Sequence, residues 1–391
     1  MLARSLIFKL SPITSVRSIT TSSRSLPFLF SLFPTSTSSS SLSSPHQLPH
    51  QIRRMSTEQK KGDITSWASK DGEFRRQQST FRDSISKDGK FTPDKGRYVL
   101  YVSLACPWAH RTLIVRKLKG LEEYFDVSIV HAHMGALGWS FYPPIRGEDG
   151  EYLKTSGEVG EDDGLKDVIR DPLYDSKFVR ELYFKANPDY DARFTVPIVW
   201  DKKTETIVNN ESSEIIRFMN TAFNDVISKE HAELDLYPED KAVRAEIDSQ
   251  NDWVYNTVNN GVYKSGFATT QKAYENNVLP LFESLDRLEK MLEGGKEFVA
   301  GDKLTEADVR LFTTLIRFDP VYVSHFKCNL GTVRHDYPNL NRWMKNLYHN
   351  YPAFKETTNF EHIKMHYFTS HPQINPTRIV PVGPTPPIEA L

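Results

Sequence analysis

Residues 97–120 read RYVLYVSLACPWAHRTLIVRKLKG, and this stretch decides the fold. Its first seven residues are rich in β-branched and aromatic side chains, which predicts a buried strand over 97–103. Pro107 suits the first turn of a helix, because its missing N–H would have no partner there, and Gly120 is typical of a helix end. Between them, apolar side chains recur at helical spacing, at Leu113, Ile114 and Leu118. The stretch therefore predicts a strand and a helix joined by a short turn.

Cys106 lies in that turn, directly before the predicted helix. The unpaired N–H groups and the dipole of a helix amino terminus favour an anion, so a thiol there ionises more readily. Strand, Cys-Pro pair and helix form the arrangement of a thioredoxin-like active site, but Ala109 occupies the position of the second cysteine of dithiol enzymes. Two-cysteine thioredoxin chemistry is therefore excluded, and a mixed disulfide on Cys106 needs an external thiol for its release. A lone cysteine is more often structural, but this combination favours a catalytic one.

The composition is that of a soluble globular protein, with 39% hydrophobic and 25% charged residues. The 391 residues are enough for two domains with sizeable cores. No apolar run is long enough to span a bilayer, which argues against a membrane protein. The two cysteines, Cys106 and Cys328, cannot form a disulfide framework and indicate a reducing compartment.

The net charge of −1 conceals an asymmetry between residues 1–54 and the rest of the chain. The first 54 residues contain no Asp or Glu, and their basic residues are Arg4, Lys9, Arg17, Arg24, Arg53 and Arg54. All 50 acidic residues therefore belong to the remainder, which is acidic overall. That remainder lacks the excess of positive charge that binds nucleic acid, which excludes this class of partner.

Residues 1–54 are rich in serine and threonine and cannot bury enough apolar surface to fold alone. A segment that is rich in serine, contains arginine and lacks acidic residues is typical of an organelle transit peptide. The serine content favours a plastid over a mitochondrion. An ordinary disordered tail is the alternative, and a start at Met55 would give a cytosolic form.

After the Cys106 helix, the pattern predicts strands over 126–130, 193–201 and 206–209, and a helix that begins at Glu211-Ser212. In thioredoxin-like folds a Val-Pro pair such as Val196-Pro197 has a cis peptide bond that faces the active-site cysteine. Glu211-Ser212 is a natural seat for a carboxylate group, because backbone N–H groups point outward there. The alternative is that these two residues only cap the helix. An acidic stretch over 147–171 is interpreted as a surface insertion.

From about residue 228 onward the strand patterns stop and helices are predicted over 239–259, 271–293 and 305–318. Thr305 and Asp308 form a capping box at the start of the third helix. Residues 371–391 are rich in proline and glycine and are predicted to be an extended tail. A mixed α/β half followed by an all-helical half is the plan of the glutathione transferases.

The motifs resemble those of the glutathione transferase superfamily, and within it those of the glutathionyl-hydroquinone reductases, the Xi class. The resemblance extends from about residue 70 to 383, and Asn-Asn-Gly-Val-Tyr together with Arg-Phe-Asp-Pro-Val-Tyr is its most specific part, since omega-class enzymes share Cys-Pro. The matching residues are 103–110 (SLACPWAH), Gly138-Trp139, Thr195-Val196-Pro197, Asn210-Glu211-Ser212, 259–263 (NNGVY), 317–322 (RFDPVY) and His366-Tyr367.

The resemblance implies a thioredoxin-like domain over 55–225 that binds glutathione and an all-helical domain over 226–370 that carries the quinol site. It implies a homodimer, glutathione as co-substrate and no bound cofactor. Cys106 would be the nucleophile and Tyr263 the proton donor, while Tyr322 and Tyr367 would lower the pKa of the Cys106 thiol. The residues that would hold glutathione are Trp139, Arg193, Phe194, Thr195, Val196, Glu211 and Ser212.

The residue types agree with this chemistry. A thiolate attacks the sulfur of a glutathionyl adduct, and the aromatic carbon that leaves must receive a proton, which a phenol can supply. Two alternatives remain. One is an omega-like enzyme that reduces dehydroascorbate or protein–glutathione disulfides, and the other is a non-catalytic domain that only binds glutathione.

Other residues have ordinary explanations. His110 follows Cys106 by about one helical turn and could form a Cys–His pair or a metal site, but two ligands do not make a zinc site, and we expect no metal. Cys328 is expected to be structural. Without the resemblance, each of the three tyrosines would be assigned to packing.

Overall fold

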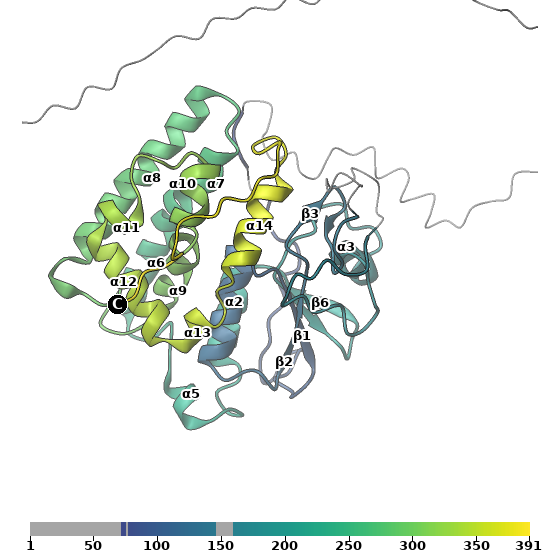
Figure 1. Cartoon of the computed structure of the whole chain (residues 1–391). Coiled ribbons are helices and arrows are strands. Elements are labelled where there is room, and N and C mark those ends of the chain that lie inside the picture. The colour runs from purple at the N-terminus through teal and green to yellow at the C-terminus, as the bar shows by residue number, and fades with distance from the viewer. Residues whose placement is uncertain (1–71, 76, 146–158) are drawn as a thin grey trace, which may run out of the picture. The chain divides into compact units, whose positions relative to one another are not determined.

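The computed structural model describes residues 72–75, 77–145 and 159–391 (Figure 1). All of them belong to one unit, Gln59–Leu391. The predicted transit peptide over 1–54 lies outside the described residues and stays a prediction. None of the described helices has the length and apolar character that a membrane span requires.

A four-stranded mixed sheet, in the order β2-β1-β5-β6, forms the centre of the first half. Strand β1 (Tyr98–Val102) runs parallel to β2 (Phe125–Ile129) and antiparallel to β5 (Ile198–Asp201), and β5 pairs with β6 (Thr206–Asn209). Every residue of β1 is buried, because β1 has a neighbour on each side and both of its faces are covered. The predicted strands are thus confirmed, except that β5 begins at Ile198, so residues 193–197 of the predicted strand over 193–201 form no strand.

Helix α2 (Pro107–Leu118) begins one residue after Cys106, which is its N-cap, and has Pro107 as its first residue. The chain leaves the helix through Gly120 at φ +60°, a conformation that favours glycine. A Cβ atom on Gly120 would lie 2.4 Å from the ring of His231, so a side chain would not fit there. The predicted strand, turn and helix are confirmed.

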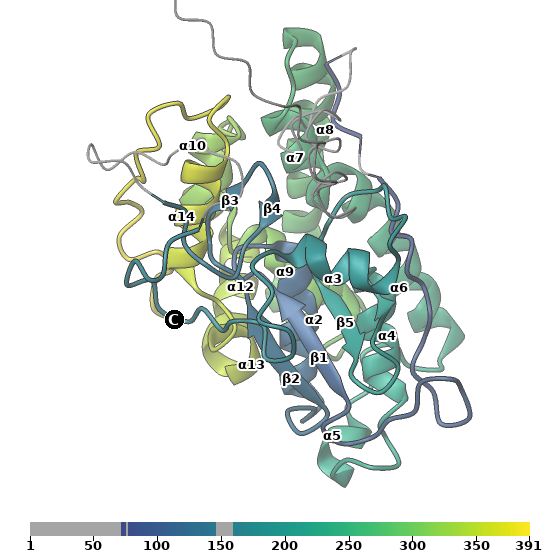
Figure 2. The ribbon, with the colours of Figure 1, turned by 90° about the vertical axis from the view of Figure 1, so that its right-hand side faces the viewer.

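Two further helices and a hairpin complete this half. Helix α3 (Val179–Ala186) packs against β6, and α4 (Ser212–Thr221) packs against α2 (Figure 2). The hairpin joins β3 (Met134–Gly135) to β4 (Gly138–Trp139).

The acidic stretch 147–171 is mostly exposed in its described part, 159–171, and contacts the sheet through Ile169 and Asp171. Ile169 exchanges two backbone hydrogen bonds with Ile129 at the edge of β2, at 2.9 and 3.0 Å. The Asp171 carboxylate accepts a hydrogen bond of 2.7 Å from the hydroxyl of Tyr101 in β1. The described part therefore lies at the surface, as interpreted, and the finding that composition did not predict is that its end pairs with the edge of β2.

The second half is helical, as predicted. The predicted helices over 239–259, 271–293 and 305–318 match the structure to within a few residues. Two short π-helical turns, η1 and η3, were not foreseen. The elements are α5 (Lys229–Glu233), α6 (Lys241–Val254), η1 (Tyr255–Asn259), α7 (Gly261–Gly266), α8 (Gln271–Met291), η2 (Glu293–Gly295), α9 (Glu306–Leu315), η3 (Phe318–Tyr322), α10 (Val323–His325), α11 (Val333–Asp336), α12 (Pro338–Asn350), α13 (Pro352–Lys355) and α14 (Phe360–Ser370).

The two halves meet at α2, which packs against α4 of the first half and against α9 and α13 of the second (Figure 1). Cys106, at the start of α2, therefore lies where the sheet domain adjoins the helical domain. The tail over 371–391 contains no helix or strand, as predicted, and follows the helical half. The Lys364 Nζ donates to the Val382 carbonyl at 2.7 Å, and Arg334 Nη2 donates to the Pro386 carbonyl at 2.7 Å.

The predicted capping box at the start of α9 is present and lies in the core. The Asp308 carboxylate is fully buried and accepts hydrogen bonds from the backbone N–H groups of Val299 (2.9 Å) and Thr305 (3.0 Å) and from the Trp343 indole (3.0 Å). Burial raises the pKa of Asp308 to about 6, although these hydrogen bonds oppose the shift. One carboxylate thus ties the loop before α9 to helix α12.

We expect Asp308→Ala to lower the free energy of unfolding of the full chain by about 3 kcal/mol near pH 7, because it leaves buried donors unpaired. Since the folded state raises this pKa, the carboxyl contributes more stability at low pH and loses that contribution as the pH rises through about 6. The deficit should therefore be about 1 kcal/mol larger at pH 5 than at pH 8. Urea unfolding measures both values.

Asp302→Ala is the matched control, because Asp302 is an exposed carboxylate in the same loop. Its effect should stay within about 0.5 kcal/mol. Equal stability of the two variants would show that the buried carboxylate does not hold this region together.

Candidate active site

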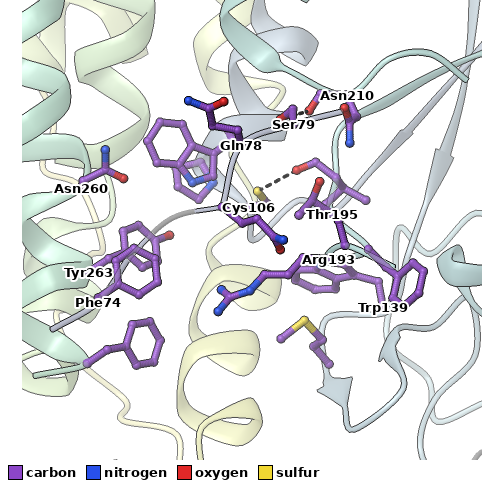
Figure 3. A pocket seen from close by; sticks show the side chains of 18 of the residues that line it. Phe74, Gln78, Ser79, Cys106, Trp139, Arg193, Thr195, Asn210, Asn260 and Tyr263 are labelled. Atoms are coloured by element: carbon purple, nitrogen blue, oxygen red, sulfur yellow. Dashed lines mark hydrogen bonds between the residues drawn. The ribbon is translucent and has the colours of Figure 1, made fainter. Parts of the chain in front are cut away.

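A cavity of about 430 Å³ lies between the two halves, and Cys106 is in its wall (Figure 3). The sheet domain contributes the start of α2, the β3–β4 hairpin and the segment before β5. The helical domain contributes α7 and α14. The lining residues that the sequence analysis had named are Cys106, Trp139, Arg193, Phe194, Thr195, Val196, Tyr263 and Tyr367.

Cys106 is partly exposed to this cavity. Its thiol donates a hydrogen bond to the Val196 carbonyl, with an Sγ–O distance of 3.5 Å (Figure 3). The Val196-Pro197 peptide bond is cis, as expected from the thioredoxin-like arrangement. Because Cys106 caps α2, its sulfur also lies at the positive end of the helix dipole, which favours a thiolate.

Arg317 of the helical domain holds the turn that carries Cys106. Its guanidinium is fully buried and donates to the carbonyls of Leu104 (3.0 Å) and Ala105 (2.9 Å). A third hydrogen bond, of 3.0 Å, goes to Nδ1 of His110. The position of the reactive sulfur therefore depends on a side chain from the other half of the molecule.

Three tyrosines converge near Cys106 from separate elements of the helical domain: Tyr263 of α7, Tyr322 of η3 and Tyr367 of α14. The hydroxyls of Tyr263 and Tyr367 are 2.5 Å apart, and those of Tyr322 and Tyr367 are 3.1 Å apart. Tyr322 is fully buried behind the other two and does not line the cavity. The three phenols thus form one hydrogen-bonded chain in the order Tyr263, Tyr367, Tyr322, and the first two line the cavity.

Burial keeps these phenols protonated. It raises the pKa of Tyr263 well above 10, and the charges of Tyr322 and Cys106 add to the shift. Burial likewise raises the pKa of Tyr367 well above 10 and that of Tyr322 to about 12. An ordinary phenol pKa near 10 is therefore the wrong value for Tyr263, whose hydroxyl remains a proton donor throughout the physiological pH range.

Five of the expected glutathione residues line the cavity from the sheet domain: Trp139, Arg193, Phe194, Thr195 and Val196. Trp139 stacks on His366, with ring centroids 4.6 Å apart. The Tyr183 hydroxyl donates to the Thr195 carbonyl at 2.8 Å and so fixes the segment that precedes the cis peptide bond.

Glu211 and Ser212 do not line this cavity. Glu211 is the N-cap of α4, where its carboxylate accepts hydrogen bonds of 3.1 Å from the Ser213 N–H and from the Ser79 hydroxyl. It borders a neighbouring hollow that shares Gln77, Gln78 and Ser79 with the cavity. Ser212 is buried. The capping alternative describes these contacts, and the glutathione role stays a prediction.

His110 and Cys328 have structural surroundings. His110 is fully buried, and its pKa is well below the usual value because of burial and the Arg317 charge. It therefore stays neutral, accepts a hydrogen bond from Arg317 and lies 3.0 Å from the Thr357 hydroxyl. Cys328 is fully buried, which raises the pKa of its thiol. Within the part of the chain that the structure describes, no cluster of His, Cys, Asp or Glu could hold a metal ion.

Several cavity residues were not among the expected ones. Asn260 and His366 belong to the motifs Asn-Asn-Gly-Val-Tyr and His-Tyr, so their position beside Tyr263 and Tyr367 was a usable signal. Phe74 comes from a segment without periodicity, and its ring stacks on that of Tyr263 with the ring centroids 6.0 Å apart. The other aromatic lining residues outside the quoted motifs are Tyr190, Phe267 and His371.

Comparison with protein families gives two matches. The family described as "Glutathione S-transferase, N-terminal domain" matches residues 105–222, and "Glutathione S-transferase, C-terminal domain" matches residues 271–346. The first match covers Cys106 and the sheet domain, and the second covers α8 to α12 of the helical domain.

Individual relatives resemble almost the whole described chain. Glutathione S-transferase omega-like 2 of Schizosaccharomyces pombe is 57% identical over 329 residues, which are 83% of this chain and 98% of that protein. Glutathionyl-hydroquinone reductase YqjG of Escherichia coli is 48% identical over 321 residues, which are 80% of this chain and 89% of that protein.

Solved structures agree. The glutathione-bound structure of YqjG superposes with a TM-score of 0.69, covering 78% of this chain and 92% of the other at 48% identity. The glutathione transferase Xi of Phanerochaete chrysosporium superposes with a TM-score of 0.74, covering 81% of this chain and 100% of the other at 60% identity. The motifs, the fold and these relatives agree, and the chain belongs to the Xi class of the glutathione transferase superfamily.

Proposed function

We propose that this protein is a glutathionyl-hydroquinone reductase, which removes glutathione from glutathionyl-hydroquinones. The observation that carries the proposal is the chain of protonated phenols beside Cys106, with hydroxyl distances of 2.5 and 3.1 Å. Exchange between disulfides needs only a thiolate, whereas release of an aromatic carbon also needs a proton donor. The E. coli relative named for this activity supports the same conclusion.

In the first step, the Cys106 thiolate attacks the sulfur of the adduct. A disulfide bond forms between Cys106 and glutathione while the bond from that sulfur to the aromatic carbon breaks. The electron pair of the broken bond stays on the carbon, and the Tyr263 hydroxyl supplies its proton. Free hydroquinone leaves the cavity.

In the second step, a second glutathione attacks the glutathione sulfur of the mixed disulfide. Cys106 leaves as a thiolate, and oxidised glutathione forms. The proton of the incoming thiol restores the Tyr263 phenol through the chain of hydroxyls. Together the two steps convert one adduct and one glutathione into one hydroquinone and one oxidised glutathione.

Glutathione is the co-substrate in this proposal, held by Trp139 and the 193–196 segment, with Glu211-Ser212 at the end of the tripeptide. The glutathione-bound E. coli structure supports a glutathione site in this cavity. We also propose that the protein is a homodimer, on the grounds of the class resemblance. We propose that residues 1–54 direct it to a plastid, on the grounds of their serine-rich composition.

The second candidate is an omega-like thiol transferase, favoured by the name of the S. pombe relative. It would use Cys106 in the same way but would not need the tyrosines. The substrate that the enzyme turns over separates the two candidates.

Cys106→Ser should abolish the conversion of glutathionyl-menadiol and glutathione into oxidised glutathione, with a loss of at least about 10³-fold in kcat, because a hydroxyl replaces the nucleophile. Cys328→Ala is the matched control and should retain activity within about twofold. A thiol reagent should modify one thiol per native chain. Activity that survives in Cys106→Ser, or wild-type protein that does not turn over the adduct, would overturn the proposal.

Tyr263→Phe should separate the two chemistries. Removal of the proton donor should lower kcat on glutathionyl-menadiol by about 10²–10⁴-fold. Reduction of hydroxyethyl disulfide by the same variant should change less than about threefold. Tyr348→Phe, a tyrosine of α12 outside the cavity, is the control for the loss of a hydroxyl.

Two outcomes would contradict this assignment. Equal losses on both substrates would mean that Tyr263 acts on the thiolate and not on the carbon. Wild-type protein that reduces the disulfide but leaves the quinol adduct untouched would establish the omega-like candidate.

A further inference from the structure

His366 holds a hydrogen-bond acceptor in the wall of the cavity. Its side chain is only 7% exposed. The Nδ1 atom donates to the Ala132 carbonyl at 3.0 Å and lies 3.2 Å from the Ser370 hydroxyl. A proton on Nδ1 leaves the lone pair of the neutral ring on Nε2. The contact with Ala132 therefore determines that Nε2 is an acceptor.

This acceptor has no partner within the described residues: the hydrogen bonds of the His366 ring are made by Nδ1. Burial lowers the pKa of His366 to about 4, so Nε2 stays unprotonated at neutral pH. The ring is held on one side by stacking on Trp139 and contacts Tyr367, with centroids 5.1 Å apart. His366 lines the cavity, so Nε2 is the acceptor of the ring that is left for a ligand there, and it favours a ligand that donates a hydrogen bond.

We propose that Nε2 of His366 accepts a hydrogen bond from a hydroxyl group of the hydroquinone ring and thereby selects substrates with a free hydroxyl. The inference rests on the proposed function and assigns a specificity residue to it. Oxidised quinones and aryl ethers present only lone pairs, which Nε2 repels, whereas a hydroquinone hydroxyl supplies the missing donor.

The position of His366 fits this role. It precedes Tyr367, whose hydroxyl is 2.5 Å from that of Tyr263, and all three residues line the same cavity. We infer that a ring that receives its proton from Tyr263 also reaches Nε2, because both groups line one cavity of about 430 Å³. The three groups would hold and protonate the same ring.

The test compares two variants that remove different parts of the imidazole. In His366→Asn, the amide can keep the donor to Ala132 but lacks an acceptor at the position of Nε2. In His366→Gln, the longer side chain can place an acceptor near that position. His335→Asn, at an exposed histidine of α11, is the control.

Calorimetry with the full chain and saturating glutathione measures the dissociation constants of hydroquinone and 1,4-dimethoxybenzene. A general loss of stability weakens the binding of both ligands and therefore cancels in the ratio of the two dissociation constants. The difference in size between the ligands is the same for each variant and cancels when the ratio is compared with that of wild type. We expect His366→Asn to shift the ratio about tenfold toward the ether, the scale of one lost hydrogen bond. His366→Gln and His335→Asn should stay within about threefold of wild type.

An unchanged ratio in His366→Asn would overturn the inference. A variant whose only change is a higher KM for glutathione would also overturn it, because Nε2 would then bind glutathione and not the hydroquinone. Turnover of glutathionyl-menadiol by wild type is measured separately. If the ratio shifts in His366→Asn but the wild type does not turn over glutathionyl-menadiol, the acceptor role of Nε2 is retained and the proposed function is rejected. Turnover with an unshifted ratio would reject the acceptor role alone.

Discussion

The structure depends on one buried cation, Arg317, which joins the helical domain to the turn that carries the reactive thiol. Its guanidinium is fully buried, and the hydrogen bonds that it makes within the described part of the chain go to groups other than carboxylates. Such a charge is costly unless its donors are satisfied. The four acceptors are the carbonyls of Leu104, Ala105 and Thr313 and Nδ1 of His110. The geometry of the Cys106 turn is therefore determined jointly by both domains.

The same charge acts on the phenols. Burial raises the pKa values of Tyr322 and Tyr367, while the positive charge of Arg317 opposes the rise in both. One side chain thus holds the Cys106 turn by its hydrogen bonds and moderates the pKa values of two of the phenols by its charge.

The sequence predicted what is encoded locally and missed what depends on distant contacts. The strand at 97–103 and the helix from Pro107 follow from periodicity and turn residues, and the position of Cys106 follows from them. The meeting of Tyr263, Tyr322 and Tyr367 has no local signal, and only the family motifs indicated it. The π-helical turn η1 ends just before Asn260, and η3 includes Tyr322. Such turns re-aim side chains, but no residue pattern marks them in advance.

Other differences have similar causes. Ile169 is a single apolar residue within an acidic stretch, so its pairing with Ile129 at the edge of β2 could not be read from composition. Phe74 reaches the cavity although its segment has no periodic pattern. His366 belonged to a quoted motif, but its tautomer depends on the Ala132 carbonyl, which is 234 positions away in the sequence. Contacts over such separations are determined by the assembled fold.

The division of labour between the two domains explains why one thiol scaffold can serve different reactions. The sheet domain supplies a cysteine at a helix amino terminus and a cis-proline edge, which is the arrangement that exchange between sulfur atoms requires. Cleavage of a carbon–sulfur bond also requires a proton at a position that water does not reach freely. In the proposed reaction, buried phenols with raised pKa values would provide that proton, and they would not compete with the thiolate as bases because they stay neutral. On this proposal, the groups that the helical domain places opposite Cys106 decide the reaction.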